Sequence, residues 1–159
     1  LVVTPGTMVD FPNLDPIFHN VFSSYYGEKF DLGLYKPGDS KRVEFKVPAV
    51  SWIFCDIHQE MSAIVLTLNT PYFAVTDRKG EFAISGVPDG KYSLKVWYDE
   101  VSPEELERAS RSVEITPTTR RLPLIQLSAK GFVRIPHQNK LGKDYPPPGL
   151  DHRYQDVQP

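Results

Sequence analysis

The segment CDIHQEM, residues 55–61, concentrates the side chains of this sequence that could bind a soft metal ion. It holds the only cysteine, one of the four histidines and one of the two methionines of the 159-residue chain. Thiolate, imidazole and thioether groups are typical ligands of transition metals. The three residues are spaced three apart in a short stretch after the apolar run of residues 52–54, so they could face one point. We therefore expect a transition-metal site here.

A fourth donor is expected from His19, which follows a strand-and-turn pattern over residues 7–13. A loop at this place could bring its imidazole beside Cys55. Two imidazoles, one thiolate and a weak, long axial thioether form the donor set of an electron-transfer copper site. The sequence predicts one copper ion with His19, Cys55 and His58 as equatorial ligands and Met61 as the axial ligand.

Ordinary packing is the alternative for the two sulfur-containing residues. A free cysteine at a strand end often packs as a small buried hydrophobe, and a methionine before a strand often fills a core. The alternative is stronger for Met61, because a weak axial donor adds little to metal affinity. For Cys55, the metal site is favoured because His58 and Met61 follow it at a spacing typical of metal ligands.

Residues 2–68 resemble the cupredoxins, the blue copper proteins, and the Cys-x2-His-x2-Met spacing is similar to that of amicyanin. In that family the upstream histidine is commonly followed by asparagine, as in His19-Asn20. The resemblance implies a Greek-key β-sandwich with a type 1 copper ion. It also implies that the Asn20 backbone hydrogen-bonds toward the Cys55 sulfur while its side chain ties the ligand loops together. Asp56 stands where relatives often have Ser, Thr or Pro, and an anion there should lower the reduction potential.

The composition predicts an all-β chain. Fifteen prolines and ten glycines separate short β-rich runs, and helical periodicity is nearly absent. We expect a first domain over residues 1–69, with strands at 1–4, 7–11, 43–47, 51–54 and 63–68. Phe18, Phe22, Tyr25, Tyr26 and Phe30 form an aromatic-rich stretch around His19. Core and loop packing is the favoured role for these rings, and an apolar docking rim near the metal is the alternative.

A second domain is expected over residues 70–128. The segment PYFAVTDRKGEFAISGVPDGKYSLKVWYDE resembles the carboxypeptidase-regulatory or transthyretin-like β-sandwiches, through its Thr-Asp, Gly, Phe and Pro-x-Gly-x-Tyr progression. Strands are expected at 72–76, 81–85, 92–98, 113–115 and 122–127. One short helix is expected from Pro103 to about Ser110, because Ser102 can cap it and Pro103 suits its first turn.

Residues 129–159 are polar and rich in proline, so we expect an extended tail. His137 and His152 lie in this tail, where solvated histidine is the ordinary state and a second metal site is the alternative, and we assign them no role. The sequence Tyr145-Pro-Pro-Pro could wrap a neighbouring subunit. Self-association through this segment is therefore an expected possibility.

Charge and motifs exclude several classes of function. A formal net charge of -2 offers no large basic field for nucleic acid or anionic lipid. No apolar run approaches the ~20 residues of a membrane span. A lone cysteine excludes an internal disulfide, and neither a phosphate-binding glycine loop nor a nucleophile elbow is visible.

We therefore expect an electron carrier rather than an enzyme, acting on a transient redox protein partner. The combination of segments is similar to exported bacterial proteins of the plastocyanin-like type, which implies a periplasmic or secreted location. No signal-peptide pattern is present from Leu1 onward. The alternative is a non-redox β-sandwich binding module, or a copper-storage or copper-delivery protein with a docking function.

Overall fold

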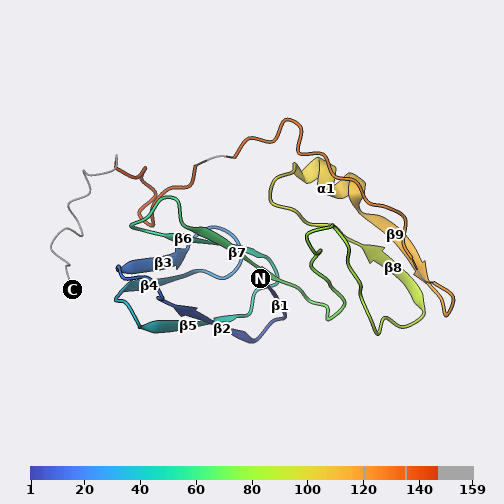
Figure 1. The fold of residues 1–159 in the computed structure, drawn as a ribbon, viewed down its shortest axis with the longest axis horizontal. Helices are drawn as coiled ribbons and strands as arrows, with labels where there is room; N and C mark the ends of the chain where they lie inside the picture. Colours follow the sequence, from blue (N-terminus) through green and yellow to red (C-terminus); the bar gives the residue numbers. More distant parts are fainter. Residues whose placement is uncertain (120, 135, 147–159) are drawn as a thin grey trace. The chain divides into compact units, whose positions relative to one another are not determined.

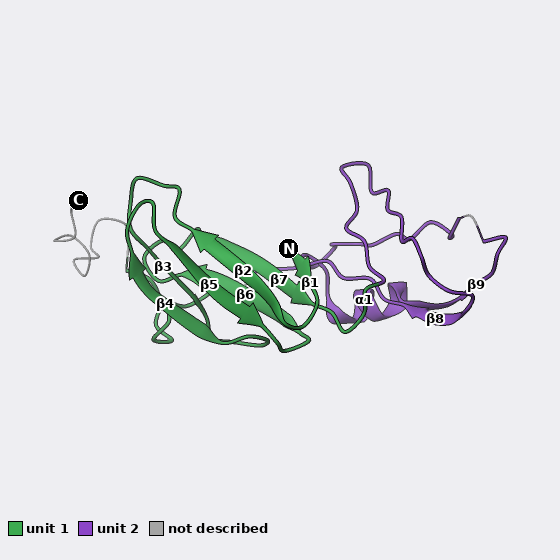
Figure 2. Ribbon diagram, turned by 90° about the horizontal axis from the view of Figure 1, so that it is seen from below, with its two compact units in different colours: residues 1–71, 137–159 green, residues 72–136 purple. Residues whose placement is uncertain are grey.

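Short β-strands form most of the regular structure, as the composition predicts. The computed structural model describes residues 1–119, 121–134 and 136–146. The chain divides into unit 1, residues 1–71 with 137–159, and unit 2, residues 72–136 (Figure 2). Unit 2 is therefore inserted, in sequence, between two parts of unit 1.

The described part of unit 1 contains two β-sheets (Figure 1). The larger sheet has the strand order β1-β7-β6-β3-β4, and the smaller one pairs β2 with β5. Strand β1 runs parallel to β7, and the other neighbours are antiparallel. The strands are β1 Val2–Val3, β2 Thr7–Pro12, β3 His19–Ser23, β4 Phe30–Tyr35, β5 Ser40–Phe45, β6 Val50–Cys55 and β7 Ser62–Thr67.

The core of unit 1 lies between these two sheets. Its buried centre consists of Val3, Phe45, Ile53 and Val65, and Val9, Phe11, Val21, Phe30 and Val43 pack against it. These side chains come from both sheets. Half-buried and exposed positions alternate along β2, as expected for a strand with one face on a core. The expected all-β class is confirmed, and the two sheets of unit 1 form a β-sandwich around this core.

The sequence did not predict strands β3 and β4. Four of the five β3 residues are buried, so both faces of this strand are covered and the alternation that reveals a strand is missing. An irregularity in register between Asn20 and Phe22 also interrupts the period of two. His19 consequently lies at the start of a strand rather than in a loop.

Unit 2 contains a two-stranded antiparallel sheet and one helix in its described part. The strands are β8 Gly90–Leu94 and β9 Arg111–Ile115, and the helix α1 is Pro103–Ala109. The predicted start of the helix is confirmed, because the Ser102 side chain accepts a hydrogen bond from the backbone of Glu105. In the ranges that the structure describes, no helix is long and apolar enough to cross a membrane.

Three expected strands of unit 2 are not formed. Residues 72–76, 81–85 and 122–127 have no strand assignment, and β8 ends at Leu94 instead of Tyr98. The turn between the first two segments does form, with Asp77 accepting hydrogen bonds from Lys79 and Glu81. Val75 remains 71% exposed, and Phe82 is exposed as well. Without a buried face, a hairpin lacks the packing that holds two strands together.

Residues 137–145, which we call the C-terminal loop, fold onto unit 1 instead of extending as a tail. The buried side chain of Asn139 accepts hydrogen bonds from the backbone of Leu141 and Lys143, at 2.9 and 3.1 Å. Gly142 has a positive φ of 69°, which suits this tight turn. Pro147, Pro148 and His152 lie outside the described residues, so only Tyr145 and Pro146 of the segment predicted to wrap a second subunit are described.

Candidate metal centre

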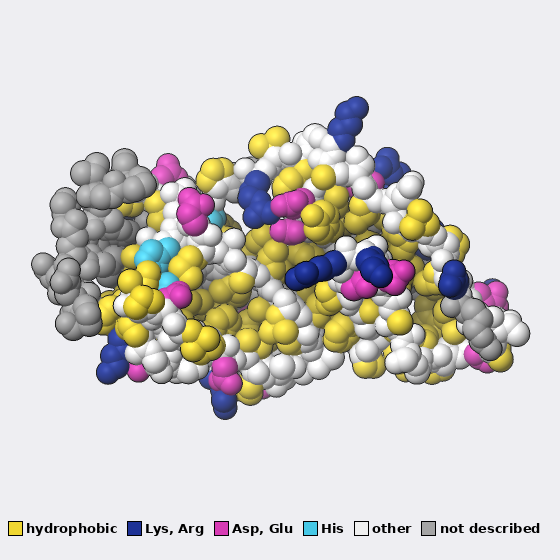
Figure 3. Space-filling view, viewed as in Figure 1, with side chains coloured by type: hydrophobic (Ala, Val, Ile, Leu, Met, Phe, Trp, Pro, Cys, Tyr) yellow, Lys and Arg dark blue, Asp and Glu magenta, His cyan; other side chains and the backbone are white. Residues whose placement is uncertain are grey.

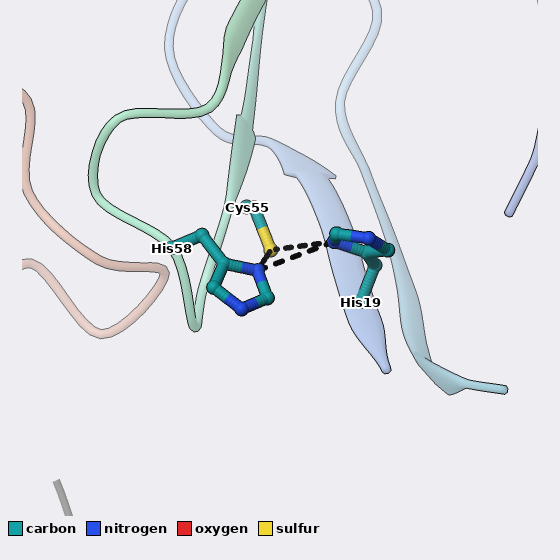
Figure 4. A group of neighbouring side chains, drawn as sticks. All are labelled: His19, Cys55 and His58. Atoms are coloured by element: carbon teal, nitrogen blue, oxygen red, sulfur yellow. Dashed lines mark hydrogen bonds between the residues drawn. The ribbon is translucent and has the colours of Figure 1, made fainter. Parts of the chain in front are cut away.

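The topology brings the start of β3 to the end of β6. These strands are antiparallel neighbours, and Val21 pairs with Cys55. His19, two residues before Val21, therefore lies just beyond the last residue of β6. Figure 4 shows the side chains of His19, Cys55 and His58 pointing toward one another from these two strands and the loop that follows β6.

The loop after Cys55 is closed by its own backbone. Met61 N–H donates to the carbonyl of His58 at 3.0 Å, and Cys55 N–H donates to the carbonyl of Met61 at 3.3 Å. This closure turns the chain back over the end of β6. The imidazole of His58 consequently returns to the side of the Cys55 thiol.

Three donor atoms converge at this place. Cys55 Sγ lies 3.5 Å from His58 Nδ1 and 3.8 Å from His19 Nδ1, and the two Nδ1 atoms are 3.2 Å apart. Cys55 and His19 are buried, whereas His58 is half-buried. Among the described Asp, Glu, His and Cys residues, this is the group whose ligand atoms could share one metal ion.

The spacing of the donor atoms fits a metal ion. With metal–nitrogen and metal–sulfur bonds of ~2.0 and ~2.3 Å, tetrahedral to trigonal angles require about 3.3–3.5 Å between nitrogens and about 3.5–3.7 Å between sulfur and nitrogen. The three distances lie within about 0.2 Å of these ranges. The donor set of one thiolate and two imidazoles suits copper, and its softness disfavours calcium or magnesium.

Asp15 orients the imidazole of His19. Its Oδ2 atom lies 2.9 Å from His19 Nε2, which leaves Nδ1 directed at Cys55. Asp15 is itself positioned by Asn13, whose side chain accepts from the Asp15 backbone and donates to the Ile17 carbonyl. A carboxylate on the outer nitrogen of a ligand histidine fixes its tautomer. We did not predict this role for Asp15; its only signal in the sequence is the four-residue spacing to His19.

The electrostatic surroundings keep His58 neutral. Burial lowers its pKa below the ordinary histidine value, the nearby His19 lowers it further, and Asp15 opposes both effects. A neutral imidazole has the free lone pair that a metal ligand needs. The ring of His58 is therefore ready to bind a metal near neutral pH.

Asn20 joins the two ligand segments, mainly through its backbone. Its carbonyl accepts a hydrogen bond of 2.9 Å from the backbone of Asp56, the residue after Cys55. The Asn20 side chain donates to Asp31 on β4 and accepts from Lys140. The resemblance implied a side-chain link between the ligand loops, whereas this side chain contacts β4 and the C-terminal loop. Asp56 is buried, and its carboxylate accepts a hydrogen bond from the backbone of Lys140.

Met61 differs from the other three predicted ligands in its surroundings. The residue is 38% exposed, and its backbone forms both hydrogen bonds that close the loop. Its role as an axial ligand remains a prediction.

His137 is half-buried, whereas a solvated ring was expected in this segment. Its ring stacks on Phe54 with centroids 4.0 Å apart, and its Nε2 atom lies 2.7 Å from the Gln59 carbonyl. Composition misled here, because a polar, proline-rich stretch can still fold against a domain when its side chains find partners.

No family model and no curated protein sequence matches the chain. A solved structure described as a novel purple cupredoxin from Nitrosopumilus maritimus is 25% identical, with a TM-score of 0.39. The match covers 42% of this chain and 75% of that one. The group formed by His19, Cys55 and His58 has one thiol and two imidazoles, the donor types that the resemblance to cupredoxins led us to expect.

Proposed function

We propose that this chain is a type 1 copper protein that carries single electrons. His19, Cys55 and His58 would be the equatorial ligands, and Met61 the axial one. The convergence of one thiol and two imidazole nitrogens within 3.2–3.8 Å of one another carries this proposal. A copper ion bound by these groups would supply a one-electron Cu(II)/Cu(I) couple.

The residues around the donors would limit their movement when an electron is transferred. His19 and Cys55 are held by strands of the same sheet, and Asp15 holds the outer nitrogen of His19. Buried donors on a packed sandwich cannot change position without disturbing the core. The same geometry would then serve both oxidation states.

His58 is the proposed exit for electrons, because it is the most exposed of the three converging donors and lies on a short loop. In Figure 3, histidine atoms reach the surface among hydrophobic side chains. A small apolar surface suits a redox partner that binds weakly and dissociates quickly. The transient protein partner and the periplasmic or secreted location belong to this proposal.

Copper addition tests the proposal directly. Cu(II) added to the metal-free protein should give an intense visible charge-transfer band from thiolate to copper. The band should be absent in Cys55→Ser, provided that circular dichroism shows the same fold. A wild-type protein with an intact thiol and no such band would contradict the proposal.

Copper storage or delivery would use the same donors, so a second measurement is needed to separate these functions. An electron carrier should give reversible voltammetry and fast electron exchange between its Cu(I) and Cu(II) forms. A delivery protein should instead release its copper readily to a chelator. Slow, irreversible electron transfer together with rapid release would favour delivery.

A further inference from the structure

Lys140, in the C-terminal loop, contacts the residues that follow two of the proposed copper ligands. Its ammonium group donates a hydrogen bond of 2.6 Å to the side chain of Asn20, which follows His19. Its backbone N–H donates at 3.0 Å to the carboxylate of Asp56, which follows Cys55. The ammonium group also pairs with Asp31 at 2.9 Å. One residue therefore links both strand ends that carry buried donors.

His137 and Tyr145, at the two ends of the same loop, contact the remaining parts of the ligand segment. The Tyr145 hydroxyl donates a hydrogen bond of 2.7 Å to the carbonyl of Cys55 itself. His137 donates to the carbonyl of Gln59, the residue after His58, and stacks on Phe54. The rings of His137 and Tyr145 also meet edge to face, with centroids 5.2 Å apart.

Hydrogen bonds within the C-terminal loop hold its turn. Asn139 fixes its turn from inside through the bonds to Leu141 and Lys143, and its own backbone bonds to Lys143 and Gly142. A loop held by such internal bonds keeps its side chains in place when they bind a neighbour. The C-terminal loop therefore contacts Cys55 itself and the residues that follow His19, Cys55 and His58 in the sequence.

We propose that the C-terminal loop is a clamp that positions the copper ligands, with Lys140 and Tyr145 as its main positioning residues. This inference depends on the proposed function, because it assigns the loop to the same site. The clamp acts on the backbone of Cys55 and on the residues after the donors, so it sets the geometry of the donors without binding the metal. Local opening of residues 55–61 then requires the loop to detach.

Amide hydrogen exchange in the metal-free, full-length protein tests the clamp without copper. Lys140→Met removes the ammonium group and keeps an unbranched side chain one atom shorter, and Tyr145→Phe removes the hydroxyl alone. Each should speed exchange in residues 55–61 roughly tenfold, since each removes hydrogen bonds that oppose local opening. Lys143→Met is the matched control, because Lys143 is exposed and bonds to Asn139 through its backbone. Lys140→Arg, which keeps the charge and donors, should restore most of the protection.

Exchange that rises equally in β2 and β5 would overturn the clamp, since it would indicate a general loss of stability. Unchanged exchange in residues 55–61 would overturn it as well. In the copper-loaded protein, Tyr145→Phe should shift the charge-transfer band and the reduction potential, while Lys143→Met should leave both unchanged. Failure of the wild type to bind copper would count against the proposed function, and the exchange measurement would still decide whether the clamp exists.

Discussion

Asp15 Oδ2 lies 2.9 Å from Nε2 of His19, and the other nitrogen of the same ring faces the thiol of Cys55. The carboxylate thus fixes which nitrogen of His19 is free for a metal. The carboxylate also makes that nitrogen a stronger metal ligand, because a hydrogen-bonded carboxylate increases the basicity of the ring.

Removal of this carboxylate should weaken copper binding. Asp15→Ala should lower the affinity by roughly 10- to 100-fold, the usual cost of losing such a partner. A competition titration against a chelator measures this change. Asp10→Ala is the control, because Asp10 pairs with Arg42 on the exposed side of β2 and β5 and lacks any contact with His19. Equal affinities in the two variants would contradict the role of Asp15.

Replacement of Met61 should change the potential more than the affinity. Met61→Leu should retain copper and raise the reduction potential, because an apolar side chain cannot donate to the oxidised ion. Voltammetry and metal analysis of the purified variant measure the two effects. Complete loss of copper would show that Met61 has another role.

The charge of Asp56 should affect the potential. Its buried carboxylate lies directly after Cys55 and favours the more positive, oxidised ion. Asp56→Asn keeps the shape and removes the charge, so the reduction potential should rise. Voltammetry of copper-loaded Asp56→Asn beside the wild type checks this, and identical potentials would argue against the effect.

Asp31 should contribute to acid sensitivity. Burial alone would raise its pKa, but hydrogen bonds from Asn20, Gly33 and Lys140 together hold the pKa below its ordinary value. A carboxyl group with a lowered pKa stabilises the fold fully above the ordinary value of about 4 and loses this contribution as the pH falls through the lower, folded value. In urea unfolding of the metal-free protein, Asp31→Asn should therefore show a shallower loss of stability below about pH 4. The same slope in both proteins would contradict this prediction.

The core between the sheets should be sensitive to truncation. Phe45 is fully buried and packs against Phe11 and Phe30. Phe45→Ala should lower the free energy of unfolding by about 3–5 kcal/mol. Urea denaturation followed by fluorescence measures the change. A loss below about 1 kcal/mol would show that the site repacks.

Local spacing made part of the centre predictable. Cys55 and His58 are three residues apart, and a turn after a strand is enough to bring them together. His19 required a long-range pairing that the sequence does not state; the resemblance to cupredoxins and the His19-Asn20 dipeptide pointed to it. The strand that carries His19 was missed, because burial on both faces removes the alternation that marks a strand.

The contacts of residues 137–145 were not predictable from composition. A stretch with polar residues and prolines is typical of a tail, and nothing in its local pattern shows that Lys140 meets Asn20. Such a contact depends on where two distant segments lie in the fold. In unit 2 the opposite error occurred, since regular turns and alternating residues predicted strands that lack a covered face.

The insertion of unit 2 between β7 and the C-terminal loop has a practical consequence for protein engineering. The entropy of closing a chain segment rises only by about 0.6 kcal/mol for each doubling of its length. Residues 137–145 should therefore return to the sandwich whether the intervening segment is long or short, if its ends can span the gap. Residues 72–136 are thus a segment that a foreign domain or a sensor could replace in a chain that carries the proposed metal centre.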